Sequence, residues 1–350
     1  MNSSNTSLYH MKSGTSTLVY NIIGITMSIL FIVALFENIL VLVIYRSNKK
    51  LQSKTNLWII AVIVCDLLIV LNAFPFLIIA SFAQEYIFGL AGCKWDGFVV
   101  TLLGTSSIFL LTGLSVHRCL IMMFGTRTRS YKRTNIILCI VACFILGLFW
   151  GITPLIGWGS FSLEGINISC APDWRSQRIE DLTYTIAMYV CVLFIPLLIM
   201  AYCYFRILLK IWREKRNHST WIQQRRVRRD IRVTISVALT ILSFLVSWMP
   251  YAVVSLLESF FNMDLITISP MLVQLPCLMA KTACIWNPLV YVCHNSQFRD
   301  AFIDRFKILR RFKKENNERD SEISLDSART FRVKNQLSQK SNINGKISKL

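Results

Sequence analysis

Residues 270–293 read PMLVQLPCLMAKTACIWNPLVYVC, and this stretch decides the fold because it is an apolar run with a single lysine inside it. A run of about 20 apolar residues in a helix crosses the ~30 Å hydrocarbon core of a bilayer. The charged residues nearest to Lys281 in sequence are Asp264 and Arg299, so the lysine lies far from both predicted membrane surfaces. An ammonium there costs ~2.5–3.5 kcal/mol on insertion scales, which indicates a functional site rather than an incidental lysine.

Similar apolar runs recur throughout the first 293 residues. The chain has 350 residues, of which 54% are hydrophobic and 16% charged, and a soluble globule of this size cannot bury so much apolar side chain. The predicted spans lie near residues 18–45, 56–82, 92–123, 134–156, 184–210, 232–257 and 268–293. The expected fold is therefore an all-α membrane protein with a seven-helix bundle.

The distribution of basic residues predicts the orientation of this bundle. The first, third and fifth connections and the C-terminal tail hold 33 of the 38 Lys and Arg residues. By the positive-inside rule the N-terminus is outside and the tail is cytoplasmic. Because the charge of +19 flanks membrane spans, it indicates contact with anionic lipid and an acidic partner protein rather than nucleic acid.

Four segments are expected on these grounds. They are an extracellular segment at 1–17, the bundle at 18–293, an amphipathic helix on the cytoplasmic side at 294–309 and a disordered tail at 310–350. The amphipathic helix is predicted because Phe298, Phe302 and Phe306 recur at i, i+4 and i+8 with charges between them. The tail is polar and poor in aromatic residues.

Two of the eleven cysteines fall on the predicted oxidising side of the membrane. Cys93 begins the third span and Cys170 lies in the second outer loop, so one structural disulfide is expected. Asn2, Asn5 and Asn167 begin N-x-S/T sequons on the same side and are candidate glycosylation sites.

The seventh span resembles that of the opsins, in which a lysine binds retinal six residues before an N-P-x-x-Y motif. Here the lysine is Lys281 and the motif is Asn287, Pro288 and Tyr291. N-P-x-x-Y recurs across rhodopsin-like receptors, so the lysine at this offset is what selects opsins. The resemblance extends over roughly residues 20–305. Other matching positions are Asn38, Asp66, Cys93, Arg118, Pro154, Gly157, Trp158, Pro196, Tyr204, Trp248, Pro250 and Tyr251.

This resemblance implies a light-sensing G protein-coupled receptor in the plasma membrane or a photoreceptive membrane. It implies retinal bound to Lys281 as a protonated Schiff base, 11-cis in the dark and all-trans after light. A protonated imine in so dry a place needs a nearby carboxylate as counterion. It also implies that Trp248 and Tyr251 contact the chromophore, although their spacing on the sixth span is equally typical of packing.

Two acids are candidates for the counterion. Asp96 lies one helical turn after Cys93, at the third-helix counterion position of the family, and could also be a near-surface residue beside Lys94. Glu164 lies six residues before Cys170 and matches the second-loop counterion of many invertebrate-like opsins, although a loop glutamate is usually solvated.

A second set of residues resembles the cytoplasmic switch of rhodopsin-like receptors, in which an arginine is held at rest and released when the sixth helix swings outward. The matching residues are Arg118, Asp230 and Tyr204, together with the N-P-x-x-Y motif. His117 replaces the usual acid before the arginine, so the intrahelical ion pair is absent. Because histidine titrates near physiological pH, we hypothesise weaker locking and pH-sensitive basal signalling.

The resemblance implies a heterotrimeric G protein as partner, with a receptor kinase and arrestin acting at the tail. A retinal photoisomerase and a rhodopsin-like receptor for a diffusible ligand are the alternatives. The N-P-x-x-Y motif and basic inner loops disfavour the isomerase, and Val100 stands where an amine receptor would carry an aspartate. No catalytic triad, metal-ligand spacing or phosphate-binding loop appears in the sequence, so neither an enzyme nor a metal site is predicted.

Overall fold

The computed structural model describes residues 15–125, 132–216, 221–261, 269–294, 298–303 and 307. The chain divides into two compact units, Met1–Arg299 and Asp300–Leu350. In the second unit, residues 300–303 are helical. Most of the predicted amphipathic helix and the predicted tail lie outside the described residues, so both remain predictions.

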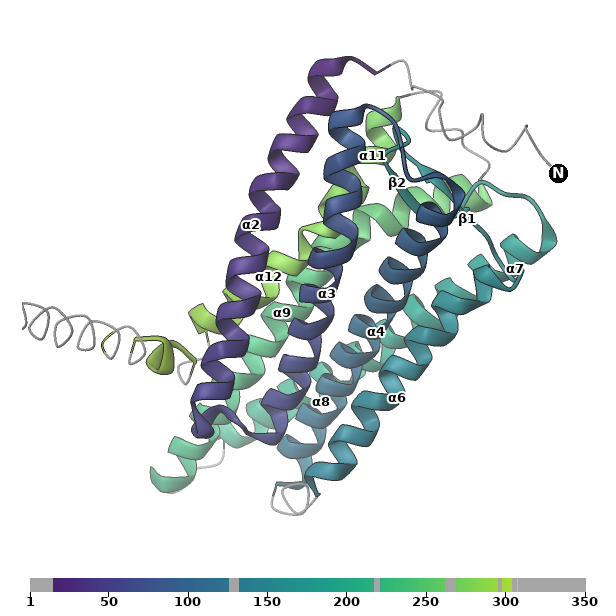
Figure 1. The fold of residues 1–350 in the computed structure, drawn as a ribbon. Helices are drawn as coiled ribbons and strands as arrows, with labels where there is room; N and C mark the ends of the chain where they lie inside the picture. The colour runs from purple at the N-terminus through teal and green to yellow at the C-terminus, as the bar shows by residue number, and fades with distance from the viewer. Residues whose placement is uncertain are drawn as a thin grey trace, which may run out of the picture. The chain divides into compact units, whose positions relative to one another are not determined.

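The first unit is a bundle of long helices that lie side by side (Figure 1). The helices before the hairpin are α2 (Thr17–Ser47), α3 (Lys54–Ala83), α4 (Gly89–Phe124) and α6 (Arg133–Ile152), with the short turns η2 (Lys49–Leu51) and η3 (Thr153–Leu155). Those after it are α7 (Ile179–Met188), η4 (Tyr189–Phe194), α8 (Ile195–Arg216), α9 (Trp221–Phe260), α11 (Pro270–Lys281) and α12 (Ala283–His294). The predicted all-α fold is confirmed.

In the described part of the chain, six helical segments are long and apolar enough to cross a membrane by themselves. The seventh predicted span is interrupted at Thr282, which separates α11 from α12, so neither half reaches the length of a span. The Thr282 N–H still bonds to the carbonyl oxygens of Leu278 and Met279, at 3.3 and 3.0 Å. Together the two halves cover residues 270–294, which matches the predicted span at 268–293.

The fifth span contains a wider helical turn. Residues 189–194 form a π-helix, and the Ile195 N–H bonds to the carbonyl of Val190. Pro196 follows directly and has no N–H to continue the α-helical ladder, which accounts for the local change in hydrogen bonding. The turn buries the side chains of Tyr189 and Val192 inside the bundle.

The structure adds a β-hairpin that the spans do not predict. β1 (Phe161–Glu164) pairs with β2 (Ser169–Pro172), and Glu164 lies opposite Ser169 in the register. Gly165 and Asn167 form the turn with φ of 58° and 64°. The hairpin packs against α4 at the end where that helix begins (Figure 1). A loop segment is thereby held over one end of the bundle.

The helix α4 is central, because it contacts α3, α6 and α8 as well as both strands. Its contact with α6 depends on Gly147. A Cβ atom built there would overlap the Ser106 hydroxyl and lie 2.6 Å from the Leu102 carbonyl oxygen. Since a carbonyl oxygen of the helix backbone cannot turn aside, the two helices can lie this close only without a side chain at residue 147.

We predict that Gly147→Ala destabilises the protein by about 1–3 kcal/mol, because the added methyl group overpacks the contact between α4 and α6. Thermal unfolding of the purified protein in detergent measures the effect. Ala142→Leu is the control, since Ala142 lies exposed on the same helix. Equal melting temperatures for Gly147→Ala and the native protein would contradict this account of the packing.

Candidate functional site

A cavity lies inside the bundle and reaches the hairpin. Its volume is about 150 Å³, and its walls come mainly from α3, α4, η4, α9, α11, α12 and the two strands of the hairpin. Most of the side chains that line the cavity are aliphatic or aromatic. Lys281 and Glu164 also line it, carry opposite charges and contact each other directly. A cavity of this kind suits an apolar ligand with one polar end.

Lys281 is the last residue of α11, and its side chain ends at the cavity wall. It is 7% exposed. Its Nζ lies 4.0 Å from Glu164 Oε1 and 3.5 Å from the sulfur of Cys277, one helical turn earlier. The structure therefore places the amine inside the bundle beside a carboxylate, which offsets part of the cost of burying its charge.

Glu164 is buried, which argues against a solvated loop glutamate. Its Oε1 accepts hydrogen bonds from the hydroxyl of Ser169 at 3.0 Å and the thiol of Cys277 at 2.9 Å. Its Oε2 accepts one from the hydroxyl of Tyr251 at 2.9 Å. Donors from β2, α9 and α11 thus hold one carboxylate in one orientation, as a buried anion requires.

Aromatic residues of α9 form the neighbouring wall. Tyr251 accepts a hydrogen bond from the indole nitrogen of Trp174 at 2.8 Å and packs edge-on against Trp248, with ring centroids 6.0 Å apart. Phe244 stacks on the other side of Trp248 at 5.7 Å. A Cβ atom at Gly104 would lie 3.3 Å from the Trp248 ring, so that ring sits closely against α4. Phe244, Trp248 and Tyr251 all line the cavity.

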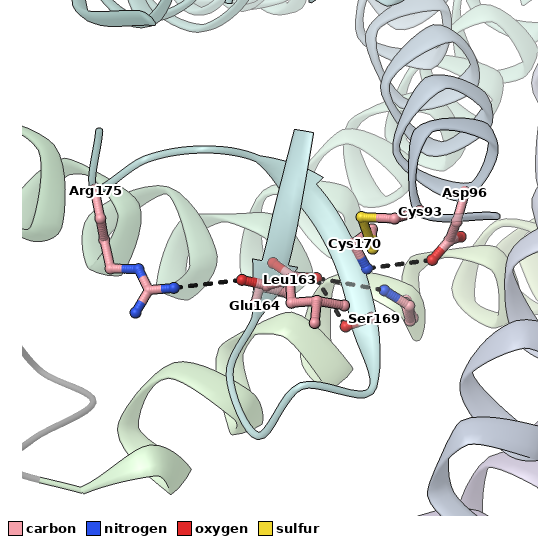
Figure 2. Close-up of a disulfide and its surroundings, with 8 residues drawn as sticks. Cys93, Asp96, Leu163, Glu164, Ser169, Cys170 and Arg175 are labelled. Atoms are coloured by element: carbon pink, nitrogen blue, oxygen red, sulfur yellow. Dashed lines mark hydrogen bonds and ion pairs between the residues drawn. A yellow bond between two sulfur atoms is a disulfide. The ribbon is translucent and has the colours of Figure 1, made fainter. Parts of the chain in front are cut away.

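Asp96 contacts the hairpin backbone. Its Oδ2 accepts a hydrogen bond from the Cys170 N–H at 3.2 Å, next to the disulfide between Cys93 and Cys170 (Figure 2). The predicted disulfide is confirmed. Asp96 is buried, and among the described residues its Oδ1 has no hydrogen-bond partner. Within the same part of the chain, no hydrogen bond or ion pair joins Asp96 to Lys281.

Below the cavity, a polar cluster connects the first, second and seventh spans. The Asn287 amide donates to Asp66 at 2.7 Å, and the Asn38 amide donates to the Cys284 carbonyl at 3.0 Å. Pro288 and Tyr291 are buried in α12 on the same side. The N-P-x-x-Y motif therefore faces the interior of the bundle.

The proposed switch residues lie towards the end of the bundle away from the hairpin. Arg118 and His117 are buried in α4, and the His117 ring lies 6.5 Å from that of Trp58. Tyr204 lies in α8, partly buried. Asp230 lies in α9, but its side chain is outside the described part of the structure, so its proposed contact with Arg118 remains a prediction.

Of the three sequons, only Asn167 falls in the described part of the chain. It occupies the hairpin turn and is partly exposed. Asn2 and Asn5 lie outside the described residues. Glycosylation at all three stays a prediction.

The sequence analysis missed several residues of this site. Ser169, Trp174 and Cys277 surround Glu164 and Tyr251. Cys277 lies four residues before Lys281, and this i, i+4 spacing is a signal that the sequence does carry. For Ser169 and Trp174 we find no such signal, because their positions follow from how the second outer loop folds.

Glu37 was also missed, although it stands inside the apolar run of α2 as plainly as Lys281 does in the seventh span. Its Oε1 is buried, with no hydrogen-bond partner among the described residues. An acid at membrane depth is expected to be functional by the same argument that selected Lys281.

Comparison with known proteins gives a consistent result. The model of the 7 transmembrane receptor (rhodopsin family) matches residues 37–291. A GQ-coupled rhodopsin of Mizuhopecten yessoensis is 31% identical over 81% of this chain, and a G0-coupled rhodopsin of the same species is 30% identical over 81%. This chain spans 59% and 72% of their lengths. Melanopsin-A of Gadus morhua is 30% identical over 84% of this chain and 54% of its own length.

The fold is also similar to a solved structure. The crystal structure of squid rhodopsin superposes with a TM-score of 0.78 at 28% identity, covering 85% of this chain and 88% of that one.

Proposed function

Because this chain belongs to the rhodopsin family of seven-transmembrane receptors, which are multi-pass membrane proteins and not enzymes, we propose that it is a light sensor. In this proposal Lys281 binds retinal, and the receptor signals to a heterotrimeric G protein. The observation that carries it is the Lys281 amine, which lies 4.0 Å from a buried carboxylate at the wall of an apolar cavity. Retinal supplies light absorption and a change of shape on isomerisation, from 11-cis to all-trans.

The residues present fit such a ligand. An aldehyde needs an amine for a Schiff-base linkage, and a buried lysine is suited to that chemistry. The apolar chain of retinal needs a chamber such as the one between α4, η4 and α9. A protonated linkage needs a fixed negative charge, which Glu164 provides. Trp248 and Tyr251 would contact the ligand from α9.

The two candidate acids have different roles in this proposal. Glu164 is the main counterion, because it is the acid in direct contact with Lys281. Asp96 holds the hairpin through the Cys170 N–H and adds a second negative charge without a direct contact. Coulomb energy falls with distance, so the nearer carboxylate dominates.

Signal transfer is proposed to run through α9. A change in ligand shape would press on Trp248, which packs closely against Gly104 of α4. Movement of α9 would release Arg118 and expose the basic inner surface to the acidic surface of a G protein. Tyr204, Asn287, Pro288 and Tyr291 are the other proposed switch residues. A receptor kinase and arrestin are proposed partners of the tail.

The relatives named above as GQ-coupled and G0-coupled rhodopsins support receptor signalling over the two alternatives. A retinal photoisomerase would bind the same ligand without activating a G protein. A receptor for a diffusible ligand would show no retinal binding through Lys281.

We predict that the purified apoprotein, mixed with 11-cis-retinal in the dark, develops a visible absorption band that changes on illumination. Lys281→Ala should lack the band because Lys281 is the only lysine in the cavity lining among the described residues, whereas Lys94→Ala, at an exposed lysine, should keep it. A band that survives Lys281→Ala would contradict the proposal. A normal band without light-dependent nucleotide exchange on a G protein would favour the photoisomerase.

The counterion is tested with an isosteric pair of variants. Glu164→Gln removes the charge nearest to Lys281, so the protonated linkage should lose its proton and the visible band should disappear near neutral pH. Asp96→Asn should keep the band, because Glu164 remains. Absorption spectra across a pH titration measure both effects, and the opposite pattern would assign the counterion to Asp96.

A third prediction concerns His117. His117→Glu places a carboxylate beside Arg118 and should reduce G-protein activation in the dark, because the carboxylate adds a charge-assisted contact to the arginine in the resting state. The His117 ring is buried and lies against Trp58. The prediction therefore depends on the absence of an acid at position 117 and not on protonation of the histidine. Nucleotide exchange in the dark measures the effect, and equal rates for the two proteins would rule out weaker locking.

A further inference from the structure

Two free thiols meet where α4 packs against α8, towards the end of the bundle away from the hairpin. Cys119 of α4 is 9% exposed, and Cys203 of α8 is 4% exposed. A hydrogen bond joins the two thiols, and both belong to one apolar cluster with Ile207. A buried cysteine is ordinarily a small packing residue. Two buried cysteines in contact across separate helices can also be oxidised to a disulfide.

The two thiols lie directly beside residues of the proposed switch. Cys119 follows Arg118 in α4, and Cys203 precedes Tyr204 in α8. Tyr204 also lies within electrostatic range of both Arg118 and Cys203. A covalent bond between the thiols would therefore join the two helices at the point where they carry these switch residues.

We propose that Cys119 and Cys203 form a redox-sensitive pair, which hydrogen peroxide converts to a disulfide between α4 and α8 and which thereby lowers signalling. In the first step one thiol attacks a peroxide oxygen, which gives a sulfenic acid and one water molecule. The second thiol then attacks the sulfenic sulfur and releases a second water molecule. The two thiols thus lose two protons and two electrons, and one peroxide becomes two waters. The effect on signalling rests on the proposed function, whereas the chemical step does not.

The surroundings of the pair suit a slow and reversible oxidation. Burial keeps large oxidants away from the thiols, whereas hydrogen peroxide is small and uncharged. Cys119 is the more exposed of the two and is therefore the first to react. The pair lies towards the predicted cytoplasmic side, where disulfides are usually transient and redox-sensing because cellular thiols reduce them again.

The bond would restrain the inner ends of two helices. A disulfide holds its two Cα atoms about 4.4–6.8 Å apart. With that bond in place, α4 and α8 could neither slide nor separate beside Arg118 and Tyr204. In the proposed function Arg118 is released when α9 moves, and a bridge that keeps the resting packing of α4 on α8 opposes this rearrangement. Oxidation should therefore lower activation of the G protein.

The site is tested chemically in the intact chain, without ligand or G protein. Protein treated with hydrogen peroxide and digested without reductant should yield the peptides of Cys119 and Cys203 joined together, with the mass of the two peptides less two hydrogens. A thiol reductant should separate them. Cys119→Ser and Cys203→Ser should each abolish the joined peptide, whereas Cys139→Ser, at an exposed free thiol of α6, should leave it unchanged. Absence of the joined peptide from the oxidised native protein would overturn the inference.

The consequence is tested by light-dependent nucleotide exchange on a G protein, with the receptor loaded with retinal. Peroxide should lower the rate of the native receptor by about fivefold or more, which is the lower end of common coupling between sites, and a thiol reductant should restore it. Cys119→Ser and Cys203→Ser should signal at the native rate and keep that rate after peroxide, and either variant suffices if the other does not fold. An equal loss of rate in the native receptor and in the serine variants would overturn control of signalling by this bond.

The outcomes separate this inference from the proposed function. If the native receptor activates no G protein in the light, the proposed function fails, and the joined peptide still decides whether the two thiols form a bond. If the native receptor signals but its rate is the same with and without the bond, the inference fails alone.

Discussion

The positive charge of Lys281 inside an apolar bundle is the constraint on which the rest of the site depends. A lone ammonium at that depth is costly, and it is tolerated when a carboxylate lies close and is itself satisfied. Glu164 provides that carboxylate, and its position explains why three separate elements contribute donors to it. The pair places two charged groups in an otherwise largely apolar lining. In the proposed function, a ligand bound there attaches at Lys281.

The hairpin brings Glu164 to that point and holds it there. A disulfide joins β2 to α4, Asp96 accepts the Cys170 N–H, and the amide oxygen of Gln274 accepts the Ile166 N–H at 3.1 Å. Tyr20 of α2 adds a hydrogen bond to the Ile166 carbonyl at 3.2 Å. These contacts tie the turn and the second strand to α2, α4 and α11. A loop residue is thereby held as firmly as a helix residue, which the proposed counterion role requires because the effect of a charge depends on distance.

A second group of polar residues extends from the cavity wall into the bundle. Asp66 lines the cavity and accepts a hydrogen bond from Asn287 of the N-P-x-x-Y motif. The break at Thr282 lies between Lys281 and that motif, so the two halves of the seventh span meet where the ligand site ends and the polar cluster begins. Thr282 alone separates the helix that carries Lys281 from the helix that carries the motif. Glu37 adds an acid to the first span, in the helix that contributes Asn38 to this cluster.

The sequence by itself determined the spans, the buried lysine, the disulfide and the family. The spans, the lysine and the family depend on local composition or on spacing along one helix, as with apolar length, an isolated charge and the N-P-x-x-Y offset. The disulfide follows from the predicted topology, which puts Cys93 and Cys170 on the same side of the membrane. The sequence left open whether Asp96 or Glu164 is the counterion, and it did not indicate that Ser169 and Trp174 belong to the site. Those depend on how the hairpin pairs and where it packs, which are contacts between residues distant in sequence. Only the tertiary structure decided that Glu164 lies beside Lys281 while Asp96 bonds to the hairpin backbone, because distances between separate elements follow from packing and not from spacing.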